Sequence, residues 1–150
     1  MIVLTKLIFL HSCRFFETNI MSVIDQVILI TGSRNWEDQE LIRSALLPYA
    51  NKTVLLIHGD CRGADKLAGE VAEELNFQLS VAPANWKLYG RAAGPIRNKE
   101  MVNQAKRFQE AGIPTIVLAF HDSLHLSKGT KSCVEMAIKA GLTISYQKHE

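Results

Sequence analysis

The sequence predicts an α/β domain of Rossmann-like type, a three-layer sandwich around a mainly parallel five-stranded sheet. Short apolar runs alternate with amphipathic stretches along most of the chain. The apolar runs are continuous, as in strands buried on both faces, and parallel strands need a crossover helix between them. The 150 residues, of which 47% are hydrophobic and 21% charged, suffice for one such domain.

The first half of the chain supplies three strands and two helices. Residues 27–31 and 53–58 are apolar runs that each end at a glycine, as buried strands do before a tight turn. Between them, residues 37–50 carry apolar side chains at helical spacing. A second helical stripe at 63–76 leads to a short strand at 78–82. This half therefore predicts a strand-helix-strand-helix-strand unit.

The second half continues the alternation after a long connection at 83–94. The next helix carries its apolar stripe from Met101 to Phe108, and residues 115–120 form a strand after a Gly-Ile-Pro turn. A last helix near 131–140 leads to a final strand at 142–146. Because parallel α/β sheets bind ligands beyond the carboxyl ends of their strands, the loops after the strands are the expected site.

The charge balance argues against a general polyanion binder. The sequence has 17 Lys and Arg against 15 Asp and Glu, a formal net charge of +2. Proteins that bind nucleic acids usually carry a strongly basic face, and single-strand grooves rely on cationic tracks. A nucleic-acid partner is therefore not expected, whereas a local basic pocket for a small anion is compatible with this balance.

The cysteines indicate a reducing compartment. Cys13, Cys61 and Cys133 are odd in number, widely spaced and without a Cys-x-x-Cys pair. A disulfide framework or structural zinc site is therefore not expected, and the cytoplasm is the predicted location. His121 and His125 flank a loop-like stretch, but a metal there would need a third ligand. We expect no metal and no other cofactor.

The first twenty residues do not continue the strand-helix alternation of the rest of the chain. Their apolar stretch at 2–10 contains Lys6 and is far shorter than the roughly 20 residues that span a bilayer. No membrane partner is expected, and without a small-residue cleavage site a signal peptide is the less favoured alternative. Met21 directly precedes a clean strand. We therefore expect an N-terminal extension at 1–20 and a ligand-binding domain at 21–150.

Polar residues with ligand-binding chemistry follow the first expected strand. Gly32 permits a close backbone approach, and Arg34 can grip a phosphate with two hydrogen bonds. Ser33 and Asn35 can donate to a ligand or, as the alternative, cap the next helix.

The loop after the second strand opens directly onto a helix. Gly59 and Gly63 straddle Arg62, and Ala64 begins the helical stripe. Backbone N–H groups at a helix N-terminus form an anion site that the helix dipole reinforces. The alternative is a tight turn with Asp65 as a first-turn charge, but no turn requires Arg62. We favour the phosphate interpretation.

The connection that includes residues 83–99 is long for an α/β loop, and long loops are usually functional. Trp86 and Tyr89 can stack on a base, while Arg97 and Asn98 at a helix start can reach phosphate or ribose. A solvated surface loop is the alternative. The aromatic side chains favour a ligand-binding role.

The loop after the fourth expected strand closes with Ser127, Gly129 and Thr130 ahead of a helix. Neither a Walker A loop nor a Gly-x-Gly-x-x-Gly fingerprint occurs in the sequence. The loops at this edge nevertheless gather six cations: Arg34, Arg62, Lys87, Arg91, Arg97 and Lys128. This clustering predicts an anionic ligand.

Four segments together resemble the YspA-like branch of the SLOG superfamily. They are Gly-Ser-Arg-Asn-Trp at 32–36, His-Gly-Asp-Cys-Arg-Gly-Ala-Asp at 58–65, Pro-Ala-Asn-Trp at 83–86 and Gly-Arg-Ala-Ala-Gly-Pro-Ile-Arg-Asn at 90–98. The resemblance covers about residues 27–146. It implies a Rossmann-like fold in a superfamily of nucleotide sensors, the DNA-processing protein DprA and the Lonely-Guy phosphoribohydrolases, from a branch frequent in phages and bacteria.

Two positions carry over from the Lonely-Guy enzymes. Arg97 is similar to their arginine that faces the nucleotide, and Gly129-Thr130 resembles the end of their Pro-Gly-Gly-x-Gly-Thr-x-x-Glu motif. At the position of the glutamate, which assists departure of the base, this sequence has Cys133. A cysteine does not hold that charge in the same way, so the resemblance implies binding more than hydrolysis.

Three functions follow, of which nucleotide binding is the leading one. The domain senses or sequesters a nucleotide or nucleotide-derived phosphate ligand at the C-terminal edge of the sheet. The alternative is an N-glycosidic hydrolase of nucleoside monophosphates, with Arg97 and Asp60 or Asp65 in the catalytic roles. A DprA-like single-stranded DNA binder is the second alternative, disfavoured by the near-neutral charge. A homo-oligomer is left open as the assembly state.

Overall fold

In a computed structural model that describes Met21 and residues 23–150, five strands form one all-parallel sheet in the order β3-β2-β1-β4-β5. Its strands are β1 (Gln26–Gly32), β2 (Val54–His58), β3 (Gln78–Val81), β4 (Thr115–Phe120) and β5 (Thr143–Gln147). The predicted parallel five-stranded sheet is confirmed. The strand order reverses between β1 and β4, which is where such folds bind ligands.

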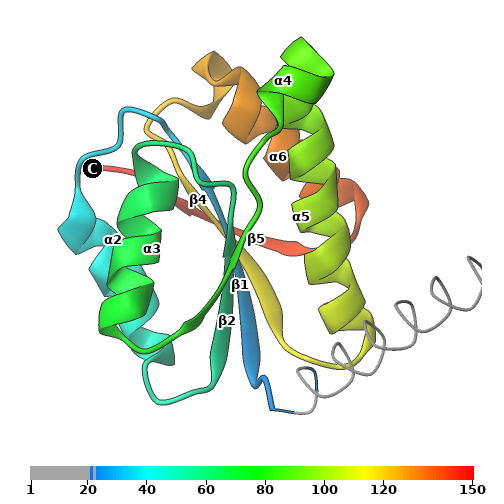
Figure 1. The fold of residues 1–150 in the computed structure, drawn as a ribbon. Helices are drawn as coiled ribbons and strands as arrows, with labels where there is room; N and C mark the ends of the chain where they lie inside the picture. Colours follow the sequence, from blue (N-terminus) through cyan, green and yellow to red (C-terminus); the bar gives the residue numbers. More distant parts are fainter. Residues whose placement is uncertain (1–20, 22) are drawn as a thin grey trace, which may run out of the picture.

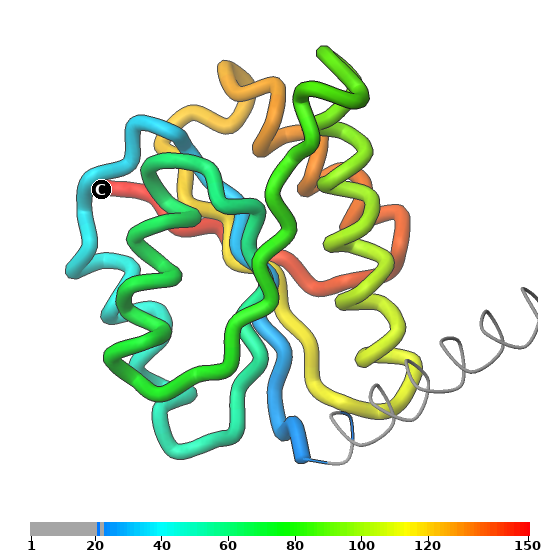
Figure 2. The backbone as a smooth tube through the Cα atoms, viewed as in Figure 1, coloured from blue at the N-terminus to red at the C-terminus, as the bar shows by residue number. Residues whose placement is uncertain are grey.

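Helices cover both faces of the sheet. Figure 1 shows α2 (Gln39–Leu46) and α3 (Ala64–Glu74) on one face and α5 (Ala93–Glu110) and α6 (Lys128–Lys139) on the other. The three-layer Rossmann-like sandwich is therefore confirmed. Figure 2 shows that the connections after β1, β2, β3 and β4 all lie at the same end of the molecule. The loops expected to share a site do share one edge.

The apolar runs are continuous because each strand packs on two layers. In β1, Ile28 and Ile30 belong to the cluster under α2 and α3, whereas Val27 and Leu29 belong to the cluster under α5 and α6. All four side chains are fully buried. Burying each such side chain contributes about 1.5–3 kcal/mol. The central strand thus fixes the sheet from which the loops project.

Helix boundaries differ from the sequence expectation where capping residues act. Helix α2 begins at Gln39 because Asp38 accepts a hydrogen bond from Leu41 N (2.9 Å), and it passes into a 3₁₀ turn (Leu47–Tyr49) that contains a proline. Helix α6 begins at Lys128, three residues before the expected start, because Ser127 Oγ accepts from Thr130 N (3.2 Å). This places the residues after Ser127 in a helix.

The connection expected as a long loop is mostly helical. It contains α4 (Trp86–Tyr89) and a 3₁₀ turn (Gly90–Ala92) that runs directly into α5. Pro95 lies in the first turn of α5, where a proline costs no hydrogen bond. The loop reading of this segment is therefore wrong, and Trp86 and Arg97 project from helical backbone.

No described helix is both long and apolar enough to cross a membrane. The expectation of an N-terminal extension concerns residues 1–20, which lie outside the described residues.

Candidate functional site

Two adjoining hollows open at the C-terminal edge of the sheet. The first, of about 340 Å³, is lined by Arg34, Gly59, Asp60, Cys61, Arg62, Pro83, Ala84, Trp86 and Arg97. The second, of about 430 Å³, is lined by Thr31, Gly32, Ser33, Arg34, Asn35, Cys61, Asp65, Arg97, Asn98, Met101, His121 and residues 126–130. They meet at Arg34, Cys61 and Arg97. Both volumes fall at the lower end of the range of about 300–1,000 Å³ for small-molecule pockets.

Backbone amides of the loop between β2 and α3 bind the carboxylate of Asp65, at the start of α3. The N–H groups of Gly59 and Cys61 donate to Oδ2 of Asp65 at 3.0 and 3.3 Å, and Asp60 N donates to Nδ1 of His58 at 3.0 Å. These three amides are therefore already satisfied. The Asp65 carboxylate therefore occupies the Gly59 and Cys61 amides, which lie in the loop where the sequence suggested an external phosphate.

Burial sets the ionisation of Asp65. Its side chain is 5% exposed. Desolvation raises the pKa of Asp65 to about 6, against the opposing effects of the Cys61 and Gly59 amides and of Arg97. Asp65 lines the second hollow. This hollow therefore contains a carboxyl group that changes its charge near neutral pH.

Arg97 joins three elements beneath the hollows. Its guanidinium donates to the carbonyl oxygen of Gly59 and to Cys61 Sγ (3.4 Å), and its Nε donates to Asn98 Oδ1 (2.9 Å). Asn98 Nδ2 in turn donates to the carbonyl oxygen of Gly129 (3.3 Å). Arg97 is only 7% exposed. It lines both hollows, but its donors are largely engaged by the protein.

Small residues let the β1 loop pack against the start of α3. A Cβ on Gly32 would lie 2.6 Å from Cβ of Ala64, and Gly63 has φ of 80° and abuts the backbone of Ser33 and Arg34. Ala64 N donates to the carbonyl oxygen of Ser33 (3.0 Å). Gly63 and Ala64 line neither hollow. These two predicted ligand-binding residues pack against the backbone of the β1 loop, whose residues line the hollows.

The first turn of α6 borders the second hollow. Ser127 caps the helix through Thr130 N, and its carbonyl accepts from Lys131 N (3.2 Å). Among the described residues, the N–H groups of Lys128 and Gly129 have no protein acceptor, as is usual in a first helical turn. A Cβ on Gly129 would meet nothing within 4 Å. An anion in the second hollow can therefore reach these amides and the dipole of α6.

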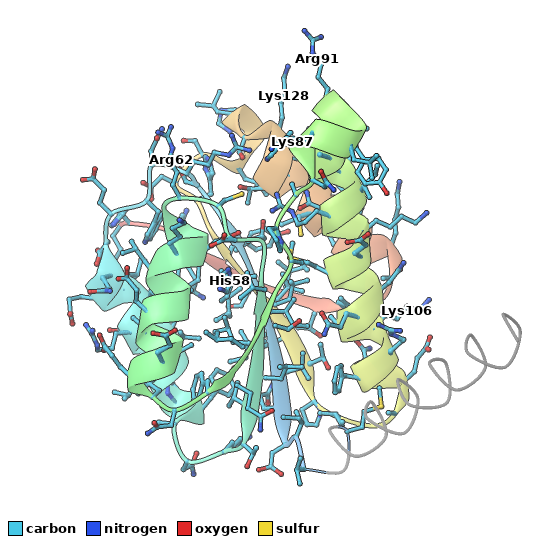
Figure 3. All side chains as sticks on the ribbon, in the orientation of Figure 1. His58, Arg62, Lys87, Arg91, Lys106 and Lys128 are labelled. Atoms are coloured by element: carbon cyan, nitrogen blue, oxygen red, sulfur yellow. The ribbon has the colours of Figure 1, made fainter. Side chains whose placement is uncertain are left out.

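Exposed cations surround the hollows. Figure 3 shows Arg62, Lys87, Arg91 and Lys128 at the same end of the molecule, with Lys106 far from it on α5. Of these four, Arg62 and Lys128 line a hollow, and Lys87 and Arg91 do not. Arg62 Nη2 donates to Asn35 Oδ1 across a long 3.5 Å. These four exposed cations thus lie at one edge of the molecule, two of them lining the hollows and two outside both.

Cys133 is a core residue. It is fully buried in the cluster under α5 and α6 and lines neither hollow. Desolvation raises the pKa of its thiol to about 11. The side chain at the position of the Lonely-Guy glutamate is therefore a neutral thiol turned into the core.

The sequence did not predict a cluster around His149 beside the second hollow, here called the histidine clasp, which consists of His149, Trp36, Asp38 and Asp122. His149 stacks on Trp36 (ring centroids 4.6 Å apart) and pairs through Nδ1 with Asp122 (2.9 Å) and through Nε2 with Asp38 (3.1 Å). These four side chains line a third hollow of about 560 Å³. Within the described part of the chain, no group of three His, Cys, Asp or Glu side chains could hold a metal ion.

The chain is similar to a protein family, to a phage protein and to a solved structure. The YspA, cpYpsA-related SLOG family matches residues 26–89. The Gene 61 protein of Mycobacterium phage D29 is 35% identical over 125 residues, which cover 78% of this chain and 92% of that protein. The X-ray structure of DNA processing protein A (DprA) from Streptococcus pneumoniae is similar over 80% of this chain and 58% of the DprA chain, with 14% identity and a TM-score of 0.49. The chain thus spans less than two thirds of DprA.

Proposed function

The chain belongs to the YspA, cpYpsA-related SLOG family, and from this premise we propose that it binds a nucleotide or nucleotide-derived phosphate ligand in the two adjoining hollows. Binding of this kind serves to sense or sequester the ligand. The observation that carries the proposal is the start of α6, where Lys128 and Gly129 line the second hollow and their N–H groups have no acceptor among the described residues.

The contrast between two helix starts supports this position for the phosphate. Before α3, Ala64 N donates to the carbonyl oxygen of Ser33, and the Gly59 and Cys61 amides of the preceding loop donate to Asp65. At α6 the capping serine leaves two amides, with the Lys128 ammonium beside them. Hydrogen bonds to a charged group contribute about 1.5–3 kcal/mol each. Two amides and one cation are sufficient for a phosphate subsite of moderate affinity.

We also propose a location in the cell and the extent of the ligand-binding unit. Cys61 and Cys133 are free thiols, which supports a reducing, cytoplasmic location. Residues 21–150 are proposed as the ligand-binding unit.

A second candidate function is hydrolysis of the N-glycosidic bond of a nucleoside monophosphate. One observation favours it: Asp65, a buried carboxyl group with a pKa raised to about 6, lines the hollow proposed for the phosphate. As a carboxylate it could stabilise an oxocarbenium-like state at the sugar. Its hydrogen bonds to Gly59 N and Cys61 N equally give it a purely structural role.

Calorimetric titration of the protein with AMP and with inorganic phosphate tests the first proposal. Lys128→Ala should weaken AMP binding about tenfold, the lower end expected for one charge-assisted hydrogen bond. Lys106→Ala, which removes an exposed lysine on α5 outside both hollows, is the matched control and should leave affinity unchanged. Equal losses in the two variants would contradict a phosphate site at α6.

Release of free adenine from AMP, followed by chromatography over hours, separates the two candidates. Binding without adenine release supports the sensing function. Release that is abolished by Asp65→Asn, with AMP binding retained, would establish the hydrolase instead.

A further inference from the structure

Trp86 presents a fixed aromatic face to the first hollow. Its side chain is 51% exposed although the indole is one of the largest apolar groups in the chain. The first turn of α4 is held by Asn85, whose Oδ1 accepts from Leu88 N (3.1 Å). The edge of the indole rests on α5, because a Cβ on Gly94 would lie 3.4 Å from Cη2 of Trp86. The capped start of α4 and the contact with Gly94 therefore hold the indole beside the first hollow.

Arg34 lies over the same ring from the opposite wall of the hollow. Its Cζ is 6.0 Å from the centroid of the Trp86 ring. A planar group stacked between them needs about 3.5 Å on each side, or about 7 Å in all. The gap is about 1 Å too narrow, and Arg34 is an exposed side chain on a loop, so a small rotation of the arginine opens it. After that rotation, an aromatic ring fits between the indole and the guanidinium.

We propose that Trp86 and Arg34 form a base slot, so that the ligand is a nucleotide recognised by its nucleobase as well as by its phosphate. This inference rests on the proposed phosphate site at α6. The hollows meet at Arg34, Cys61 and Arg97, so a base in the first hollow and a phosphate in the second place the ribose at that junction. Stacking on an indole is tolerant of base identity, so the slot takes purines and pyrimidines.

Tryptophan fluorescence reads this slot directly. The chain has two tryptophans, of which Trp36 is 4% exposed and packed in the core, so quenching by a bound base reports on Trp86. AMP and CMP should quench emission on binding, and ribose 5-phosphate should bind more weakly and without quenching. Trp86→Leu should weaken AMP and CMP binding about tenfold or more and leave ribose 5-phosphate affinity, measured by calorimetry, unchanged.

Tyr89→Leu is the matched control, because Tyr89 is an aromatic residue of the same short helix, 46% exposed and outside both hollows. It should bind AMP as the wild type does. The base slot is overturned if ribose 5-phosphate binds as tightly as AMP, or if Trp86→Leu weakens both ligands equally; the phosphate site then stands. If none of the probes binds the wild-type protein, the proposed function itself fails.

Discussion

Asp65 offers a stability prediction whose size follows from its environment. Asp65→Asn keeps a side-chain oxygen for the amides of Gly59 and Cys61 and removes the buried charge. In the folded protein the pKa of Asp65 is raised from 3.8 to about 6 by desolvation. At 1.36 kcal/mol per pKa unit, this difference corresponds to about 3 kcal/mol.

The sign follows from which form the folded state prefers. Because the folded-state pKa is raised, the protonated carboxyl favours folding. Its stabilising contribution is fully present below about pH 4 and is lost as the pH rises through about 6. The asparagine variant has no such loss. Relative to the wild type, Asp65→Asn should therefore gain about 3 kcal/mol of unfolding free energy between pH 4 and pH 8.

Urea unfolding followed by circular dichroism at several pH values between 4 and 8 measures this gain. Asp60→Asn is the matched control, because Asp60 is an exposed residue of the same loop with φ of 57°, which asparagine tolerates. The control should retain the wild-type pH dependence. A constant stability difference between wild type and Asp65→Asn across this range would refute the buried-anion account of the loop.

Two further predictions concern residues that tie the edge loops together. Arg97→Ala should lower the unfolding free energy by about 1–3 kcal/mol, because the buried carbonyl of Gly59 loses its donor; chemical denaturation at constant pH measures the loss, and an unchanged midpoint would contradict the buried role. The pKa of His149 is raised chiefly by its hydrogen bond to Asp122, with a further contribution from Asp38, so Asp122→Asn should lower it in an NMR titration of the imidazole. The contacts of protonated His149 with Asp122 and Asp38 stabilise the fold fully below the ordinary histidine pKa, and this contribution is lost as the pH rises through the raised pKa of His149. Identical titration curves for the wild type and Asp122→Asn would exclude these contacts.

The sheet was predictable because its central strands obey one simple rule. Ile28 and Leu29 point into different clusters, so a run without alternation indicates a strand covered on both sides. The connection at 83–94 was misread for a physical reason as well. A four-residue helix such as α4 is too short to show a period, and Pro95 suggests a break although the first helical turn accepts it.

The sequence predicted where the candidate site lies, but not the hydrogen bonds and ion pairs among its residues. Parallel strands bring their following loops to one edge, which placed Arg34, Trp86 and Gly129 together. Local sequence does not reveal that Asp65 turns back onto the amides of its own loop. Nor does it reveal the contact of His149 with Asp38, which lies 111 residues away in the chain. Both depend on the folded arrangement.

Amide chemical-shift mapping of the protein with AMP tests the central claim most directly. A phosphate at the start of α6 predicts that the largest changes fall on the amides of Lys128 and Gly129, with smaller changes at Arg34 and the Trp86 indole N–H. The amides of Gly59 and Cys61, which are bound to Asp65, should move less than those of α6. Largest shifts in the loop between β2 and α3, or an unchanged spectrum at millimolar AMP, would contradict the account.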